Sequence, residues 1–173
     1  MKSKRRISIL PALGLVFATI FFCRCSNTDC PLNNTVSLRA DFYQSSTGTI
    51  TNVTDTFSVI AVGRRDTTVL NRYHNFSQIK LPMGYVQTTD TLLFRFLTDA
   101  GVATDSVFIS HTNKPHFVSL DCSTAFFHTI TDVRITRRAP SADFPTAIDS
   151  IVIANPEVNY DEKQNLQIYF SNY

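Results

Sequence analysis

The chain has 173 residues, of which 43% are hydrophobic and 17% charged, and its formal net charge at neutral pH is +2. Residues 1–25 carry five of the 16 Lys and Arg and none of the 14 Asp and Glu, so the rest of the chain is acidic by three charges. Nucleic-acid-binding proteins carry a basic surface, and this balance argues against that class.

The first residues have the layout of an export signal. Four basic residues precede an apolar run from Ile7 to Cys23, an order that is typical of a secretory signal. A transmembrane anchor, which needs about 20 apolar residues, is the alternative. We predict a signal peptide over residues 1–25, a tether over 26–34 and a single domain over 35–173, long enough to bury a core of its own.

A cysteine at the end of such a run suggests lipidation. In a bacterial lipoprotein the cysteine thiol carries an acyl chain, and each buried CH₂ contributes about 0.8 kcal/mol to membrane binding. We predict that Cys25 is lipidated, with Cys23 as the alternative. Small residues normally precede the modified cysteine, whereas Arg24 stands here, so plain cleavage that releases a periplasmic protein is the other interpretation.

Two cysteines remain after this processing. The oxidising envelope favours a disulfide between Cys30 and Cys122, which would close a loop of over 90 residues. Loop-closure models assign about 4 to 5 kcal/mol to so long a loop. Two separate buried thiols are the alternative.

Short β-prone runs follow one another along the rest of the chain. The first, from Thr35 to Tyr43, alternates apolar and polar residues, which places four side chains on one face: Val36, Leu38, Ala40 and Phe42. Further strands are expected at residues 56–62, 67–70, 76–81, 92–97, 106–110, 117–120, 126–136, 148–154 and 166–170. With 21 Thr, 5 Gly and no sustained helical period, the sequence predicts an all-β protein, an antiparallel, immunoglobulin-like β-sandwich of about eight to ten strands.

Local signals add detail to these strands. Lys114-Pro115 predicts a turn or the first residue of a strand, and a slip of the alternation near Asp132 indicates a β-bulge. Five aspartates each stand before a Thr or Ser next to a β-prone run, and we interpret them as strand-entry turns rather than calcium ligands: Asp55, Asp66, Asp90, Asp105 and Asp149.

Three segments carry a resemblance to a known family. They are Asp29 to Val36; Ser110 to Asn113 with Phe117 to Cys122; and Ile148 to Ile151 with Asn155 to Glu162. Together they resemble an uncharacterised family of small Bacteroidetes-type envelope lipoproteins. The resemblance implies a lipidated envelope protein and carries over no catalytic residue; the departure from the family pattern is Arg24.

Three histidines are candidates for chemistry. His111, His116 and His128 could meet around the Pro115 turn, with Asp121 nearby, and imidazole with carboxylate is a common zinc or iron set. Their spacings match no compact metal motif, so ordinary surface or hydrogen-bonded histidines are the other interpretation, and we predict no metal and no cofactor. No nucleophile elbow and no phosphate-binding loop occurs in the sequence.

The long polar segment from Asn155 to Asn165 is the candidate binding loop, because binding residues concentrate on such loops. The residues proposed for it are Asn155, Tyr160, Asp161 and Glu162. A plain connection held down by Tyr160 is the alternative.

These features lead to one functional prediction. We expect a non-enzymatic module of the cell envelope, anchored by its lipid in the outer membrane, that binds an envelope protein or a glycan and no nucleic acid. The alternative is a metal-dependent envelope enzyme that uses the His111, His116 and His128 region.

Overall fold

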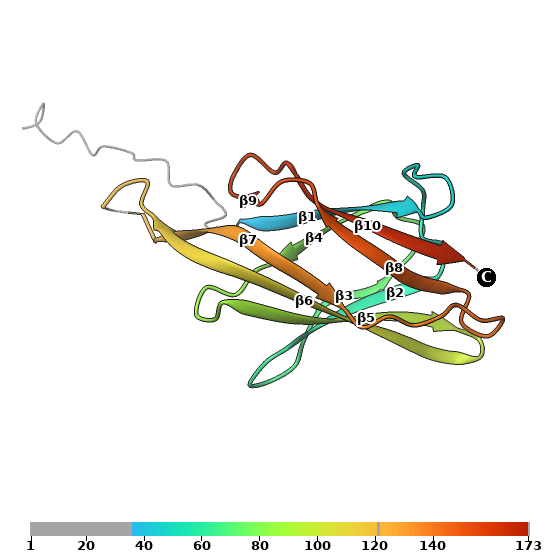
Figure 1. The fold of residues 1–173 in the computed structure, drawn as a ribbon. Helices are drawn as coiled ribbons and strands as arrows, with labels where there is room; N and C mark the ends of the chain where they lie inside the picture. Colours follow the sequence, from blue (N-terminus) through green and yellow to red (C-terminus); the bar gives the residue numbers. More distant parts are fainter. Residues whose placement is uncertain (1–35, 121, 173) are drawn as a thin grey trace, which may run out of the picture.

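The computed structural model describes residues 36–120 and 122–172, which form two packed β-sheets (Figure 1). These residues contain no helix, so the all-β sandwich prediction is confirmed. The strands are β1 (Ser37–Gln44), β2 (Thr56–Val62), β3 (Thr67–Tyr73), β4 (Gln78–Pro82), β5 (Thr89–Thr98), β6 (Gly101–His116), β7 (Ala125–Ile135), β8 (Thr146–Ile153), β9 (Glu157–Val158) and β10 (Gln164–Asn172).

One sheet has four strands in the order β4-β1-β10-β8, and the other has six in the order β3-β2-β5-β6-β7-β9. Of the strand pairs described, all are antiparallel except β1 with β10. A parallel pair cannot be joined by a tight turn, and these strands lie at opposite ends of the described chain. The antiparallel prediction is therefore wrong for this pair.

The core between the sheets is rich in phenylalanine. Phe42 of β1 makes edge-to-face contacts with Phe57 of β2, at 5.9 Å between ring centroids, and with Phe76 at 5.3 Å. Such pairs add about 0.5–1.5 kcal/mol beyond the burial of their area. The predicted inward face of the first strand is confirmed, because its residues are all buried: Val36, Leu38, Ala40 and Phe42.

The hairpin of β6 and β7 extends beyond the rest of the sandwich, at the end where β1 begins (Figure 1). β6 continues through Pro115, which pairs with Phe126, so both predictions for Lys114-Pro115, a turn or the start of a strand, are wrong. β5 begins at Thr89, opposite Ser110, so from His111 onward β6 pairs with β7 alone, an edge position where proline is tolerated. The strand predicted over residues 117–120 is also wrong, since these residues belong to the connection between β6 and β7.

The predicted β-bulge near Asp132 is confirmed. Ser110 pairs with Asp132 and His111 pairs with Ile130, which leaves Thr131 as the extra residue of β7. A bulge of one residue changes which side chains face inward along the strand. Before it His128 and Ile130 are buried, and after it the inward positions pass to the odd-numbered residues from Val133 onward.

The aspartates divide into two groups. Asp55 and Asp66 stand directly before β2 and β3, as predicted. Asp90, Asp105 and Asp149 lie inside strands instead, so the turn interpretation is wrong for them. Asp90 and Asp105 are buried, and a buried carboxylate needs a partner that the local sequence does not reveal.

Asp105 is the more deeply buried of the two, with no exposed surface. Arg138, in the connection after β7, donates to its two carboxylate oxygens at 3.0 and 3.3 Å. The backbone N–H of Ile148 in β8 donates to the same carboxylate at 3.1 Å. This ion pair therefore joins β6 to the start of β8, across a connection without regular structure.

Several predictions concern the N-terminal region. The signal peptide, the tether and the cysteines Cys23, Cys25 and Cys30 lie outside the described residues and stay predictions. In the part of the chain that the structure describes, no helix is long and apolar enough to cross a membrane.

Candidate functional site

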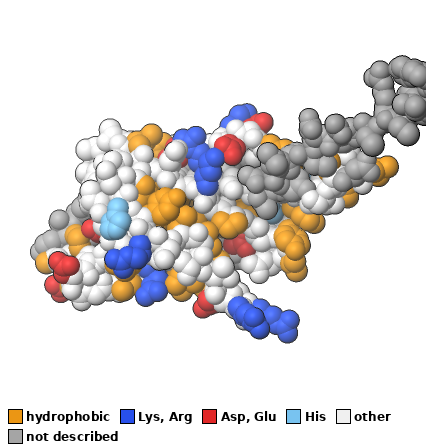
Figure 2. Space-filling model, turned by 180° about the vertical axis from the view of Figure 1, so that it is seen from behind, with side chains coloured by type: hydrophobic (Ala, Val, Ile, Leu, Met, Phe, Trp, Pro, Cys, Tyr) orange, Lys and Arg blue, Asp and Glu red, His pale blue; other side chains and the backbone are white. Residues whose placement is uncertain are grey.

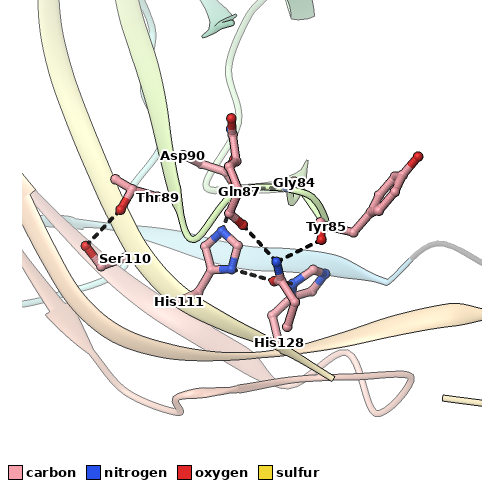
Figure 3. A network of polar contacts seen from close by, with 9 residues as sticks. Gly84, Tyr85, Gln87, Thr89, Asp90, Ser110, His111 and His128 are labelled. Carbon is pink, nitrogen blue, oxygen red and sulfur yellow. Dashed lines mark hydrogen bonds and ion pairs between the residues drawn. The ribbon is translucent and has the colours of Figure 1, made fainter. Parts of the chain in front are cut away.

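A network of buried polar side chains lies where β5, β6 and β7 run side by side (Figure 3). Pairing of β6 with β7 sets His111 beside Ile130 and Asn113 beside His128, and β5 contributes Asp90. Asp90, His111 and His128 are each less than a tenth exposed. Three strands thus bring a carboxylate and two imidazoles into the interior of the sandwich.

Asp90 is held by three donors. Its carboxylate accepts hydrogen bonds from the backbone N–H of Gly84 at 2.9 Å and from the Gln87 side chain at 2.6 Å. Nε2 of His111 lies 3.2 Å from the same carboxylate. The loop between β4 and β5 is therefore fastened to β5 and β6 through one buried acidic group.

Asn113 orients both histidines. Its side-chain N–H₂ donates to the carbonyl oxygens of Tyr85 at 3.0 Å and Gln87 at 2.8 Å, so its side-chain oxygen must accept. That oxygen lies 2.8 Å from Nδ1 of His111 and 2.7 Å from Nδ1 of His128. Both histidines consequently carry a proton on Nδ1.

The second ring nitrogen differs between the two histidines. Nε2 of His111 faces the Asp90 carboxylate, so the arrangement is satisfied when His111 holds both protons and forms an ion pair. The pKa of His128 is lowered to about 4: burial is the largest cause, His111 acts in the same direction, and Asp90 opposes the shift. At neutral pH His128 is therefore uncharged, and its Nε2 is a hydrogen-bond acceptor.

A cavity of about 310 Å³ adjoins this network. Its walls are mostly apolar, and the rings of Tyr85 and Phe126 stack at 4.9 Å between centroids. The described residues that line it are Val36, Pro82, Met83, Tyr85, Thr124, Phe126 and His128. The cavity thus lies at the end of the sandwich where the described chain begins.

His116 does not join the other two histidines. Its ring stacks on Phe127 at 4.2 Å, and neighbouring residues of a strand face opposite sides, so Phe127 and His128 point apart. Among the described residues no three His, Cys, Asp or Glu side chains are grouped to hold a metal ion. Asp121, the carboxylate proposed beside these histidines, lies outside the described residues.

The candidate binding loop is held at several points. Asn165 is buried and donates to the carbonyl oxygens of Asn155 and Glu157 at 3.1 and 2.8 Å. The ring of Tyr160 packs edge-on against Phe127 at 5.1 Å. These contacts support the alternative of a fixed connection.

The acidic residues of this loop lie at the surface. Glu162 forms an exposed ion pair with Lys80 at 2.5 Å, and Asp161 lies 3.5 Å from Lys163. Exposed pairs of this kind contribute little to stability. Binding by Asn155, Tyr160, Asp161 and Glu162 stays a prediction.

Cys122 lies in the connection between β6 and β7. The hydroxyl of Ser119 lies 3.2 Å from its sulfur. Its predicted partner, Cys30, lies outside the described residues, so the disulfide stays a prediction.

Sequence reasoning missed the residues that organise the network. In the sequence Asp90 has the pattern of a turn residue, and no motif marks Asn113 or Gln87. One signal was available: His111 and Asn113 are two residues apart, a spacing that places both on one face of a strand. The acceptors from the β4–β5 loop are backbone atoms, which leave no trace in the sequence.

Fold and site together define an all-β sandwich with a buried Asp–His–Asn–His network beside an apolar cavity. Residues 56–170 match the Family of unknown function (DUF6452), and the chain belongs to this family. The match covers two of the three segments that carried the resemblance and leaves out the segment from Asp29 to Val36. No curated protein and no solved structure matches the chain.

Proposed function

We propose that this protein is an exported lipoprotein of the cell envelope, anchored in the outer membrane, that acts as a non-enzymatic binding or assembly module. Its N-terminal sequence supports the export and the lipid anchor. Its sandwich would present one end to a partner protein of the envelope, while the other end and the sheets supply a rigid frame.

The observation that carries this proposal is a group of exposed apolar side chains at one end of the sandwich. We call it the apolar end; it consists of Tyr85, Val86, Phe117, Val118 and Leu120. Val86 is 86% exposed and Leu120 is fully exposed. Figure 2 shows hydrophobic side chains on the surface at this end, at the right of the view.

Exposed apolar groups of this kind mark interaction sites on soluble proteins. They come from two connections, the β4–β5 loop and the tip of the β6–β7 hairpin, which lie at the same end in Figure 1. The first of these is fixed to the interior by Asp90 and Asn113. The buried network therefore gives the apolar end a rigid base, and a rigid surface loses less entropy on binding.

Site-specific photo-cross-linking tests this function. A photoreactive phenylalanine at Val86 is expected to capture a defined envelope protein in living cells. The matched control is the same residue at Ile50, which is also exposed but bridges to Tyr43 near the opposite end of β1. Equal capture from both positions, or none from Val86, would contradict a partner at the apolar end.

The metal-dependent enzyme is the second candidate, and it requires ring nitrogens that converge on one ion. In His111 and His128 Nδ1 is already bonded to Asn113, and His116 of β6 stacks instead on Phe127, on the other face of the sheet. This geometry favours the binding module. Metal analysis of the purified protein distinguishes the two, because stoichiometric zinc or iron would favour the enzyme.

A further inference from the structure

We propose that the cavity beside the buried network binds a small neutral organic molecule, with an apolar body and one hydroxyl or N–H group that donates to Nε2 of His128. This goes beyond a protein partner at the apolar end. Tyr85 belongs to both sites, but the experiments separate them: a ligand in the cavity is detected at Met83, and a protein partner is detected by cross-linking at Val86.

The cavity has the size and walls of a ligand site. Its volume of about 310 Å³ lies at the small end of the range for sites that hold organic molecules. Pro82, Met83 and the stacked pair of Tyr85 and Phe126 supply apolar wall, and such walls favour an apolar or aromatic body.

The described part of the lining favours a neutral ligand. None of the described lining residues is an acid, a lysine or an arginine, and His128 is uncharged at neutral pH. A charged molecule would lose its hydration in this cavity without gaining a counter-charge. A neutral molecule avoids that cost.

The polar group of the ligand is specified by His128. Its side chain lies in the cavity wall although the residue is only 3% exposed. Among the hydrogen bonds of the described residues, those of His128 use Nδ1 alone, and in Figure 3 its other ring nitrogen points away from the network. Nε2 is thus an acceptor in apolar surroundings, and a ligand donor would satisfy it.

This acceptor is fixed in place before any ligand arrives. A change of tautomer in His128 would set a bare Nδ1 against the oxygen of Asn113, and a flip of Asn113 would set its N–H₂ against the proton on Nδ1. The carbonyl oxygens of Tyr85 and Gln87 oppose that flip. A preorganised acceptor of this kind discriminates between ligands that carry a donor and those that do not.

Methionine-methyl NMR on the full chain in lipid nanodiscs provides a direct test. The sequence contains only Met1 and Met83, and Met83 lines the cavity, so its methyl signal reports on the site. The probes are p-cresol, which offers a hydroxyl donor; 4-methylanisole, which keeps the oxygen without the donor; and toluene, which lacks both. We expect a saturable shift of the Met83 signal with p-cresol and about tenfold weaker binding of the other two.

Two variants separate the hydrogen bond from mere partitioning into lipid. His128→Phe is expected to bind p-cresol and toluene with equal affinity, and Thr124→Trp, which fills the cavity, is expected to bind neither. The fold of each variant is checked by circular dichroism, and the second variant leaves the network intact. Failure of p-cresol to give a saturable shift, or equal affinity of the wild-type chain for p-cresol and toluene, would overturn the proposal.

Discussion

The side-chain oxygen of Asn113 accepts a hydrogen bond from Nδ1 of His128 at 2.7 Å, across the pairing of β6 with β7. The contact determines which nitrogen of the histidine carries the proton. It also couples the inside of the sandwich to the β4–β5 loop, because the same amide donates to Tyr85 and Gln87. The first two predictions concern this pair.

Asn113→Ala should lower the free energy of unfolding by about 2 kcal/mol, because two imidazole N–H groups and two carbonyl oxygens lose their partner together. Denaturant unfolding measures the loss. Asn71→Ala is the matched control, since Asn71 is exposed in β3 and should change stability by no more than about 0.5 kcal/mol. Equal stability of the two variants would contradict the role of Asn113.

The stability of the protein should fall as the pH drops below about 6.5. Burial lowers the pKa of His128 to about 4, so the unfolded chain binds a proton before the folded one does. The contribution of His128 to the free energy of unfolding is complete above the ordinary histidine pKa. It is lost as the pH falls from 6.5 to 4, and about 2 kcal/mol of it is gone at pH 4.5.

The measurement is the difference in unfolding free energy between pH 7 and pH 4.5, in the wild type and in His128→Asn. The asparagine side chain can still donate a hydrogen bond to Asn113, but it cannot titrate. Both proteins retain His111 and Asp90, which face residue 128. The difference should be smaller in the variant by about 2 kcal/mol. An identical pH dependence would show that His128 does not carry the effect.

Asp105→Ala should destabilise the fold by about 3–5 kcal/mol, because it leaves the guanidinium of Arg138 partly buried without its counter-charge. Asp149→Ala is the control, since Asp149 is exposed in β8. Thermal unfolding of both variants tests this. A similar melting temperature for the two would mean that the Asp105–Arg138 pair contributes little.

Cys25→Ser should release the protein from the membrane fraction and abolish its labelling by fatty acid. The physical reason is that a soluble domain stays on a membrane only through the burial of its acyl chains. If Cys23→Ser loses the label and Cys25→Ser keeps it, the anchor is Cys23. Labelling that survives both substitutions would refute the lipoprotein prediction.

Non-reducing peptide mapping should find residues 30 and 122 in one linked peptide. Val36 and Thr124 line the same cavity, so the chain enters the sandwich close to Cys122, as a disulfide with Cys30 requires. Cys122→Ser should then lower the melting temperature without changing the fold, since the bond restricts mainly the unfolded chain. Two thiols that react with an alkylating agent in the unreduced protein would exclude the bridge.

The sequence by itself determined the fold class and the inward face of β1. Alternation of Leu38, Ala40 and Phe42 is a local pattern, and a strand with one buried face produces it wherever its partners lie. The bulge near Asp132 was predictable for the same reason, because one extra residue shifts that pattern along β7.

Only the tertiary structure decided which polar residues are buried and what they contact. Asp90 and Asp105 look in sequence like the turn residues Asp55 and Asp66. They differ because His111 of β6 and Arg138 of the connection after β7 reach them from distant parts of the chain. Pairing of β1 with β10 joins residues more than 100 positions apart. Such contacts depend on how the strands are ordered in the sheets, and a local pattern of side chains carries no record of that order.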